Sequence, residues 1–134
     1  MPRIFSVYYQ IPELISFMEE PNRSTCAKIL EENYALFSAT QGSTFNHQVW
    51  PGGYLHHIQE TMNIASTLHD TLSSLRPLPF LLSDALLVLF LHDLEKPWRG
   101  MCHLSTKRDR RNFRFQKIEE YKISLTSEQE NALM

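Results

Sequence analysis

A histidine followed by an aspartate, His92-Asp93, stands directly after an unbroken apolar run from Leu86 to Leu91. A helix that is apolar on all sides is buried, so this element delivers an imidazole and a carboxylate into the interior. An ionised carboxylate is costly to bury without a positive partner, hydrogen bonds or a metal ion. Neutral imidazole is the commonest nitrogen ligand of transition metals in proteins. The pair therefore indicates a buried cation site, the alternative being two side chains that only hydrogen-bond to each other or to a helix cap.

A second candidate ligand comes from residues 54–75, where apolar side chains recur in steps of three and four and predict one long amphipathic helix. Its apolar stripe comprises Leu55, Ile58, Met62, Ala65, Leu68, Leu72 and Leu75. His56 falls on the polar face and is expected in solvent, whereas His57 falls on the flank of the stripe and can point inward. In the other pair, His69-Asp70, the side chains diverge, so that the histidine lies at the core edge and the aspartate in solvent. His57 is therefore the better ligand.

Other helices must position these groups. Apolar spacing predicts helices over residues 12–20, 23–38 and 107–121, and the buried run is expected to form a helix capped by Ser83 and ended by Pro97. In the second helix one face should be buried, and its members are Cys26, Leu30, Tyr34 and Phe37. Thr126 with Gln129 three positions later forms a capping box that announces one more helix. The fold class is therefore all-α, a compact bundle of about five to seven helices in one domain spanning residues 1–134.

The segment between residues 39 and 53 has loop composition. Gly52 and Gly53 after Pro51 allow backbone angles that let the chain pass close to a site before a helix begins. The notable side chains of the loop are His47 and Trp50. Because loops often carry functional residues, His47 is a candidate for substrate binding.

Composition favours an intracellular protein. A chain of 134 residues with 43% apolar side chains can build one core. The N-terminus lacks the continuous apolar run of a secretory signal, and the longest apolar stretch, Leu78 to Leu91, is interrupted and too short to span a bilayer. Cys26 and Cys102 have no metal-ligand spacing and suggest no disulfide framework. We therefore expect a cytoplasmic protein with no membrane partner.

The net charge of −2 conceals a strong asymmetry. Residues 1–95 carry four basic and ten acidic side chains, and residues 96–122 carry nine basic and three acidic ones. A positive segment that follows the His-Asp pair suits an anionic substrate, because it concentrates phosphates near a metal. The alternative is a solvated helix whose charges serve solubility.

The histidine on one helix and the His-Asp pair on a later one resemble the HD-domain superfamily of metal-dependent phosphohydrolases. The segment Pro51-Gly52-Gly53-Tyr54-Leu55-His56-His57 is similar to the Pro-Gly-Gly-apolar-apolar-X-His pattern of HD domains found with 3′ to 5′ exoribonucleases. This pattern identifies His57 as the first metal-ligand histidine, which is the histidine that the helix periodicity also favours. The stretch Leu91 to Lys96 resembles the second motif, HDxGK, with Glu95 in place of glycine and the lysine kept as Lys96. The resemblance covers roughly His47 to Lys96.

The resemblance implies an HD-like helical domain in which His57, His92 and Asp93 bind a divalent metal ion. The ion would polarise water and a phosphate, with Asp93 and Lys96 as the catalytic residues. Lys96, Arg99 and His47 would bind the substrate, a phosphorylated small molecule or nucleotide. Imidazole and carboxylate ligands suit Mn, Fe, Ni, Co or Zn. Glu95 is expected to be a solvent-facing residue at the helix end, or alternatively a partner of the site.

One departure from the family leaves a second function open. The family supplies a fourth ligand, an aspartate, from a later helix. Here the only later aspartate, Asp109, comes too early and is expected to be exposed in a basic helix, so no good candidate remains, with His103 as a possible substitute. The chain thus resembles a member that lacks its C-terminal helices and could self-associate through exposed apolar surface. The alternative to a phosphohydrolase is a non-catalytic HD-fold module that binds a nucleotide or a partner. Nucleic-acid binding by the basic-aromatic stretch Lys107 to Lys117 is a third interpretation.

Overall fold

The computed structural model describes residues 7–42, 50–99 and 104–134. These residues form seven α-helices and one 3-10 helix, and no strand occurs among them. The helices are α1 (Ile11–Ser16), α2 (Asn22–Glu32), α3 (Tyr34–Ala39), α4 (Gly53–Leu75), α5 (Leu82–Leu91), η1 (Lys96–Trp98), α6 (Lys107–Glu120) and α7 (Ser127–Leu133). The all-α prediction is confirmed. Within the described ranges, no helix combines the length and the apolar character needed to cross a bilayer.

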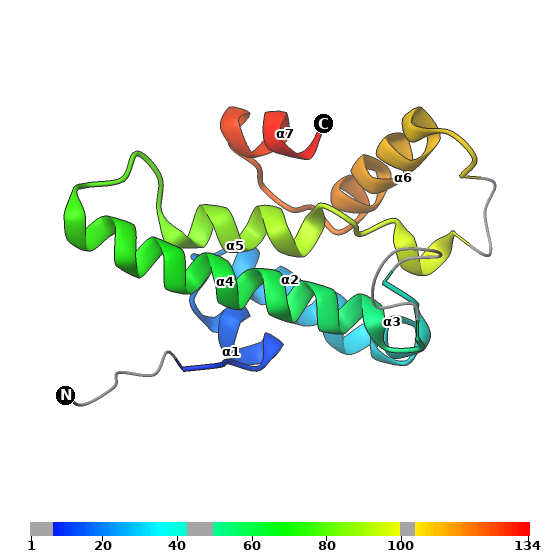
Figure 1. The fold of residues 1–134 in the computed structure, drawn as a ribbon. Coiled ribbons are helices and arrows are strands. Elements are labelled where there is room, and N and C mark those ends of the chain that lie inside the picture. The colour runs from blue at the N-terminus through cyan, green and yellow to red at the C-terminus, as the bar shows by residue number, and fades with distance from the viewer. Residues whose placement is uncertain (1–6, 43–49, 100–103) are drawn as a thin grey trace.

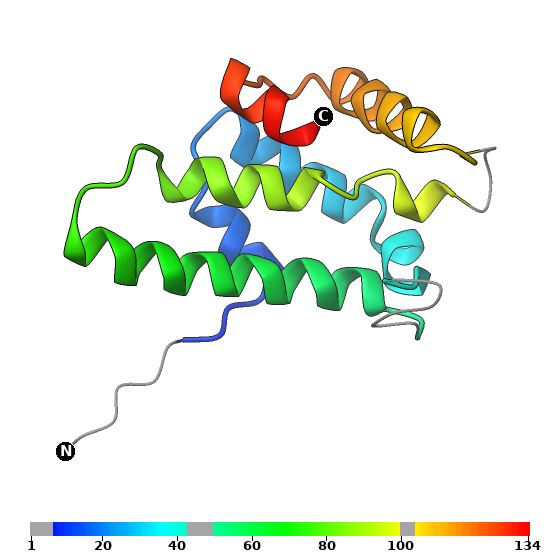
Figure 2. The ribbon, with the colours of Figure 1, turned by 45° about the horizontal axis from the view of Figure 1, so that its top comes forward.

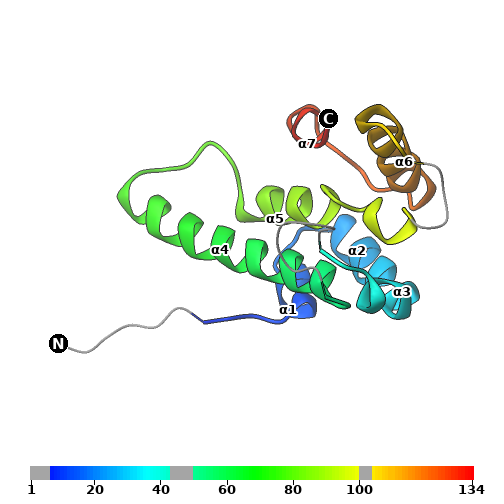
Figure 3. The same ribbon diagram turned by 45° about the vertical axis from the view of Figure 1, so that its right-hand side comes forward.

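Helices α4 and α5 form an antiparallel pair at the centre of the arrangement (Figure 1). Helix α1 packs against α2, α4 and α5, and α3 packs against the N-terminal end of α4. Helix α7 packs on α5 on the side away from α4, and α6 lies beyond the C-terminal end of α5, as the turned views show (Figures 2 and 3). Helix α5 is therefore covered from both sides, which explains why its sequence is apolar all round.

The core is formed mainly by side chains from α1, α2, α4 and α5, joined by Phe37 of α3, Leu94 of the turn after α5 and Leu133 of α7. The largest fully buried side chains are Tyr54, Phe37, Phe90, Leu14, Ile15, Ile29, Ile58, Met62, Leu86, Leu91, Leu94 and Leu133. The C-terminal helix is anchored to this core by the predicted capping box and by a contact to α5. Thr126 Oγ1 accepts from the Gln129 N–H (3.2 Å), and Gln129 Nε2 donates to Asp84 Oδ1 (2.8 Å).

The helix predicted over residues 23–38 is two helices, because the chain breaks at Asn33 (φ −112°, ψ 14°). The Asn33 side chain donates to the carbonyl of Ile29 and to the hydroxyl of Tyr121, both at 2.9 Å. Such local side-chain hydrogen bonds compete with helix continuation. The break resets the helical phase, so Tyr34, predicted to be buried, is 59% exposed.

The helix predicted over residues 54–75 is present as α4, but only part of its stripe is covered. Leu68, Leu72 and Leu75 are exposed, because α5 has only ten residues and does not cover them. Asn63, which shares the face of α4 that carries the exposed His56, is buried beneath the extended segment that precedes α1. Its Oδ1 accepts from the Tyr9 N–H (2.7 Å) and its Nδ2 donates to the Tyr9 carbonyl (2.9 Å).

The start of α5 also differs from the prediction. The helix begins at Leu82, and Asp84 Oδ2 accepts a hydrogen bond from the Leu81 N–H (3.0 Å). Ser83 is not the cap: its Oγ accepts from the N–H of Glu19 (2.8 Å) and so ties the end of the α1 segment to α5.

Candidate metal centre

The His-Asp pair lies at the end of α5 rather than within a helix. The helix stops at Leu91, and the N–H groups of Leu94 and Lys96 turn back to the carbonyls three residues earlier, at 3.1 and 3.0 Å. The sequence predicts an end at Pro97, whereas the helix ends at Leu91 and Pro97 lies instead in the first turn of η1, where a proline is tolerated. A carboxylate at a helix C-terminus meets the negative end of the helix dipole. Asp93 therefore needs positive partners.

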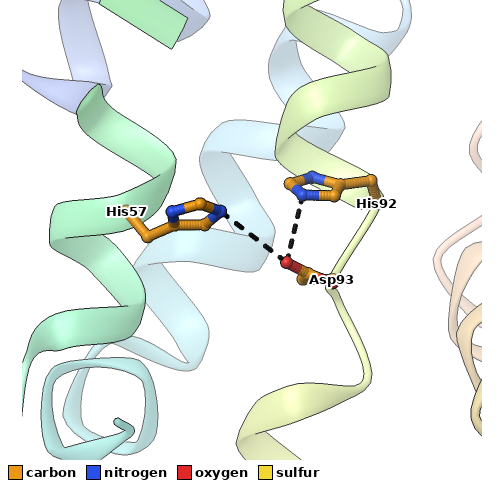
Figure 4. A group of neighbouring side chains, drawn as sticks. All are labelled: His57, His92 and Asp93. Carbon is orange, nitrogen blue, oxygen red and sulfur yellow. Dashed lines mark ion pairs between the residues drawn. The ribbon is translucent and has the colours of Figure 1, made fainter. Parts of the chain in front are cut away.

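Three potential ligands from two elements converge at this end of the α4–α5 pair. His57 points from α4 toward the turn after α5, where it meets His92 and Asp93 (Figure 4). Asp93 Oδ2 lies 3.0 Å from His92 Nε2 and 4.0 Å from His57 Nε2. The imidazole rings are 5.9 Å apart between centroids and inclined by 48°. All three side chains are partly buried, so the group is reachable from solvent.

Lys96 belongs to the same cluster. Its Nζ lies 3.2 Å from Asp93 Oδ2 and donates to the carbonyl of Gly42 at 2.7 Å. Lys96 therefore lies beside the candidate ligands, and its expected contact with a substrate anion stays a prediction. The Gly42 carbonyl, which holds the ammonium in place, comes from the loop after α3 and carries no side-chain signal that a sequence could reveal.

The electrostatics favour an ionised pair. Burial alone would raise the pKa of Asp93, but its hydrogen bonds to His92 and Lys96 and their positive charges hold that pKa well below its ordinary value. Burial likewise opposes protonation of His92, yet the hydrogen bond and charge of Asp93 outweigh it and raise the pKa of His92. The ring of His92 is oriented by its Nδ1, which lies 2.7 Å from the Leu89 carbonyl. That contact directs Nε2 to the cluster, as outer hydrogen bonds commonly do for metal-binding histidines.

The donor set fits a divalent transition metal. One ligand atom from each of His57, His92 and Asp93 lies within 4.8 Å of the other two, and no other such group occurs in the described ranges. Two donor atoms that each lie about 2.1 Å from one ion are at most about 4.2 Å apart. Side-chain shifts of under about 1 Å would therefore bring the three donor atoms within reach of one ion. His57 and His92 would offer imidazole nitrogens and Asp93 an oxygen, leaving positions for exogenous ligands.

Glu95, which replaces the usual glycine of the resembled motif, faces the interior. It is 3% exposed and its Oε1 accepts from Arg114 Nε at 2.8 Å. Arg114 also donates to the carbonyl of Leu133, so one guanidinium links α6, the turn after α5 and the end of α7. The expectation of a solvent-facing helix-end residue is wrong, because the partner is 19 positions away in sequence and only the tertiary fold brings it near.

The remaining predicted residues lie elsewhere. His56 is exposed as expected and its ring meets Trp50 edge-on at 6.2 Å. Arg99 is exposed at the end of η1, and no hydrogen bond or ion pair joins its side chain to the described part of the chain. His47 and His103 lie outside the described residues. Asp109, which the sequence does not favour as a fourth ligand, caps α6: its Oδ2 lies 3.4 Å from the N–H of Thr106.

Comparison with known proteins gave no match: no family model, no curated protein and no solved structure is similar to this chain.

Proposed function

We propose that the chain is an HD-type, metal-dependent phosphohydrolase that acts on a nucleotide or another phosphoester. The observation that carries the proposal is the convergence of His57, His92 and Asp93, from two elements, within the span of one ion. A bound divalent ion would supply Lewis-acid polarisation of a phosphoryl oxygen and activation of a water molecule. Mn, Fe, Ni, Co and Zn all suit this donor set.

The charges of the cluster support an anionic substrate. With neutral histidines, Asp93 and Lys96 cancel, because their charges are −1 and +1 at 3.2 Å separation. A divalent ion then leaves a net charge of about +2, which a phosphate group would neutralise. Lys96 would contribute a donor for a phosphate oxygen, and Arg99, exposed nearby in sequence, a second positive charge that can turn toward the anion.

A second candidate is a non-catalytic HD-fold module that binds a nucleotide or a partner. Its support is that both ring nitrogens of His92 have protein partners, the Leu89 carbonyl and Asp93 Oδ2. The charged groups of the cluster thus already pair with one another and with the backbone in an ion-pair network. In addition, the fourth ligand of the resembled family has no good counterpart, because Asp109, the only later aspartate, serves as a helix cap.

Elemental analysis of protein purified without chelator or nickel resin separates the two functions. The phosphohydrolase requires about one transition-metal ion per chain, or a rise in melting temperature on adding Mn²⁺, since a ligand that binds only the folded state stabilises it. Hydrolysis of a generic phosphomonoester should accompany metal binding. A chain with neither bound metal nor a thermal response to Mn²⁺ would leave the non-catalytic module as the better interpretation.

A further inference from the structure

Tyr54 carries a buried hydroxyl without a hydrogen-bond partner among the described residues. The side chain is 1% exposed, and its ring packs edge-on against Phe37 with 5.4 Å between centroids. Its backbone N–H donates to the carbonyl of Thr40 at 3.1 Å, which fixes the start of α4. Buried hydroxyls without partners are rare, because a phenylalanine would fill the same space without the cost of desolvating the oxygen. The packing of this position therefore does not explain why it is tyrosine.

Tyr54 lies on the same helix as the candidate ligand His57, and its hydroxyl is within range of the charges of Asp93 and Glu95. Tyr54 precedes His57 by three positions on α4, a spacing that places two side chains as neighbours on a helix surface. Burial, together with the nearby charges of Asp93 and Glu95, raises the pKa of Tyr54 well above its ordinary value, so the phenol remains a neutral donor.

The two nearby carboxylates already have other partners. Asp93 is bonded to His92 and Lys96, and Glu95 to Arg114. The Tyr54 hydroxyl is thus a donor with no acceptor among the described residues.

We propose that Tyr54 is a further ligand-binding residue of the candidate centre, whose hydroxyl donates a hydrogen bond to an oxygen atom that enters with the divalent ion. The inference rests on the proposed function and adds a residue to it. The oxygen belongs either to water or to a phosphate group, since both are acceptors at a transition-metal site. A neutral donor suits this position, because it stabilises the incoming oxygen without adding charge that would repel the ion.

The test is Tyr54→Phe, which removes only the hydroxyl. Its effect is measured by calorimetric titration with Mn²⁺ alone and with Mn²⁺ plus inorganic phosphate, together with the melting temperature of the metal-free protein. We expect the melting temperature to stay the same or rise, because an unpaired polar atom is removed. We also expect affinity to fall about tenfold, the scale of one hydrogen bond. A loss with Mn²⁺ alone assigns the oxygen to water, and a loss only with phosphate present assigns it to the phosphate.

Tyr121→Phe is the matched control. The Tyr121 hydroxyl accepts a hydrogen bond from Asn33 Nδ2 at 2.9 Å, so its loss should lower the melting temperature and leave both titrations unchanged. Unchanged titrations for Tyr54→Phe, whatever its melting temperature, would overturn the inference while leaving the proposed function in place. A wild-type chain that binds no Mn²⁺ would overturn both.

Discussion

Binding of Mn²⁺ to the candidate centre should tighten as pH rises, because His92 must lose a proton to become a ligand. Both ring nitrogens of His92 face acceptors, the Leu89 carbonyl and Asp93 Oδ2. Burial would lower the pKa of His92, but the hydrogen bond and charge of Asp93 outweigh it and raise that pKa above its ordinary value of 6.5. The raised pKa favours the protonated ring, whose proton the ion must displace.

The magnitude follows from the proton count. One proton released per ion gives a tenfold gain in affinity, about 1.4 kcal/mol, for each pH unit below the pKa of His92, and a plateau above it. Asp93 adds no proton between pH 5 and 8, because its pKa is held well below its ordinary value by the hydrogen bonds and charges of His92 and Lys96, which outweigh burial.

Isothermal titration in two buffers of different ionisation enthalpy measures this number directly. We expect at least about one proton released per Mn²⁺ at pH 6 and fewer at pH 9. The matched variant His56→Ala should reproduce the wild-type profile, because His56 is exposed and meets Trp50 rather than the cluster. An affinity that does not change between pH 5.5 and 8 would refute the reasoning, since His92 would then not be the ligand.

Three further results are expected. His92→Ala should abolish phosphomonoester hydrolysis whereas His56→Ala leaves it largely intact; equal effects would mean that the wrong histidine face has been assigned. Arg114→Met should lower the free energy of unfolding in urea by about 3–5 kcal/mol, because it leaves the buried Glu95 carboxylate without its positive partner. The double variant Glu95→Met with Arg114→Met should recover most of that free energy. A cost below about 1 kcal/mol for the single variant would contradict this reasoning. In protein without added metal, the raised pKa of His92 stabilises the folded state below pH 6.5, and this stabilisation is lost as the pH rises through the folded pKa. The lowered pKa of Asp93 stabilises the folded state above pH 3.8, and this stabilisation is lost as the pH falls. Urea denaturation midpoints measured against pH should therefore show both contributions between pH 3.8 and 6.5.

The sequence predicts which side chains converge better than it predicts their surroundings. His57 could be distinguished from His56 because α4 runs for 23 residues without interruption, so the helical phase stays reliable from one end to the other. Tyr34 could not be placed, because the break at Asn33 depends partly on the hydroxyl of Tyr121, 88 positions away. The helical periodicity of residues before such a break cannot be used to place residues after it.

Contacts between distant segments account for the other differences. The burial of Glu95 requires Arg114, and the burial of Asn63 requires the extended segment at Tyr9. In both cases a polar residue is buried because another part of the chain completes its hydrogen bonds. Hydropathy patterns record only the cost of burying such a residue, so they assign it to the surface.

The end of α5 shows how one turn sets the geometry of the whole cluster. Consecutive residues of an α-helix point about 100° apart, so a helix continuing through His92 and Asp93 would separate the two side chains. That continuation is replaced by a tighter turn, in which the N–H groups of Leu94 and Lys96 donate to carbonyls three residues earlier. The chain instead leaves the helix at Leu91, and the turn brings His92 Nε2 within 3.0 Å of Asp93 Oδ2 and Lys96 Nζ within 3.2 Å. The same turn places Asp93 at the negative end of α5, where a carboxylate is least stable alone. The feature that assembles the candidate ligands is thus also the one that gives this site its demand for positive charge.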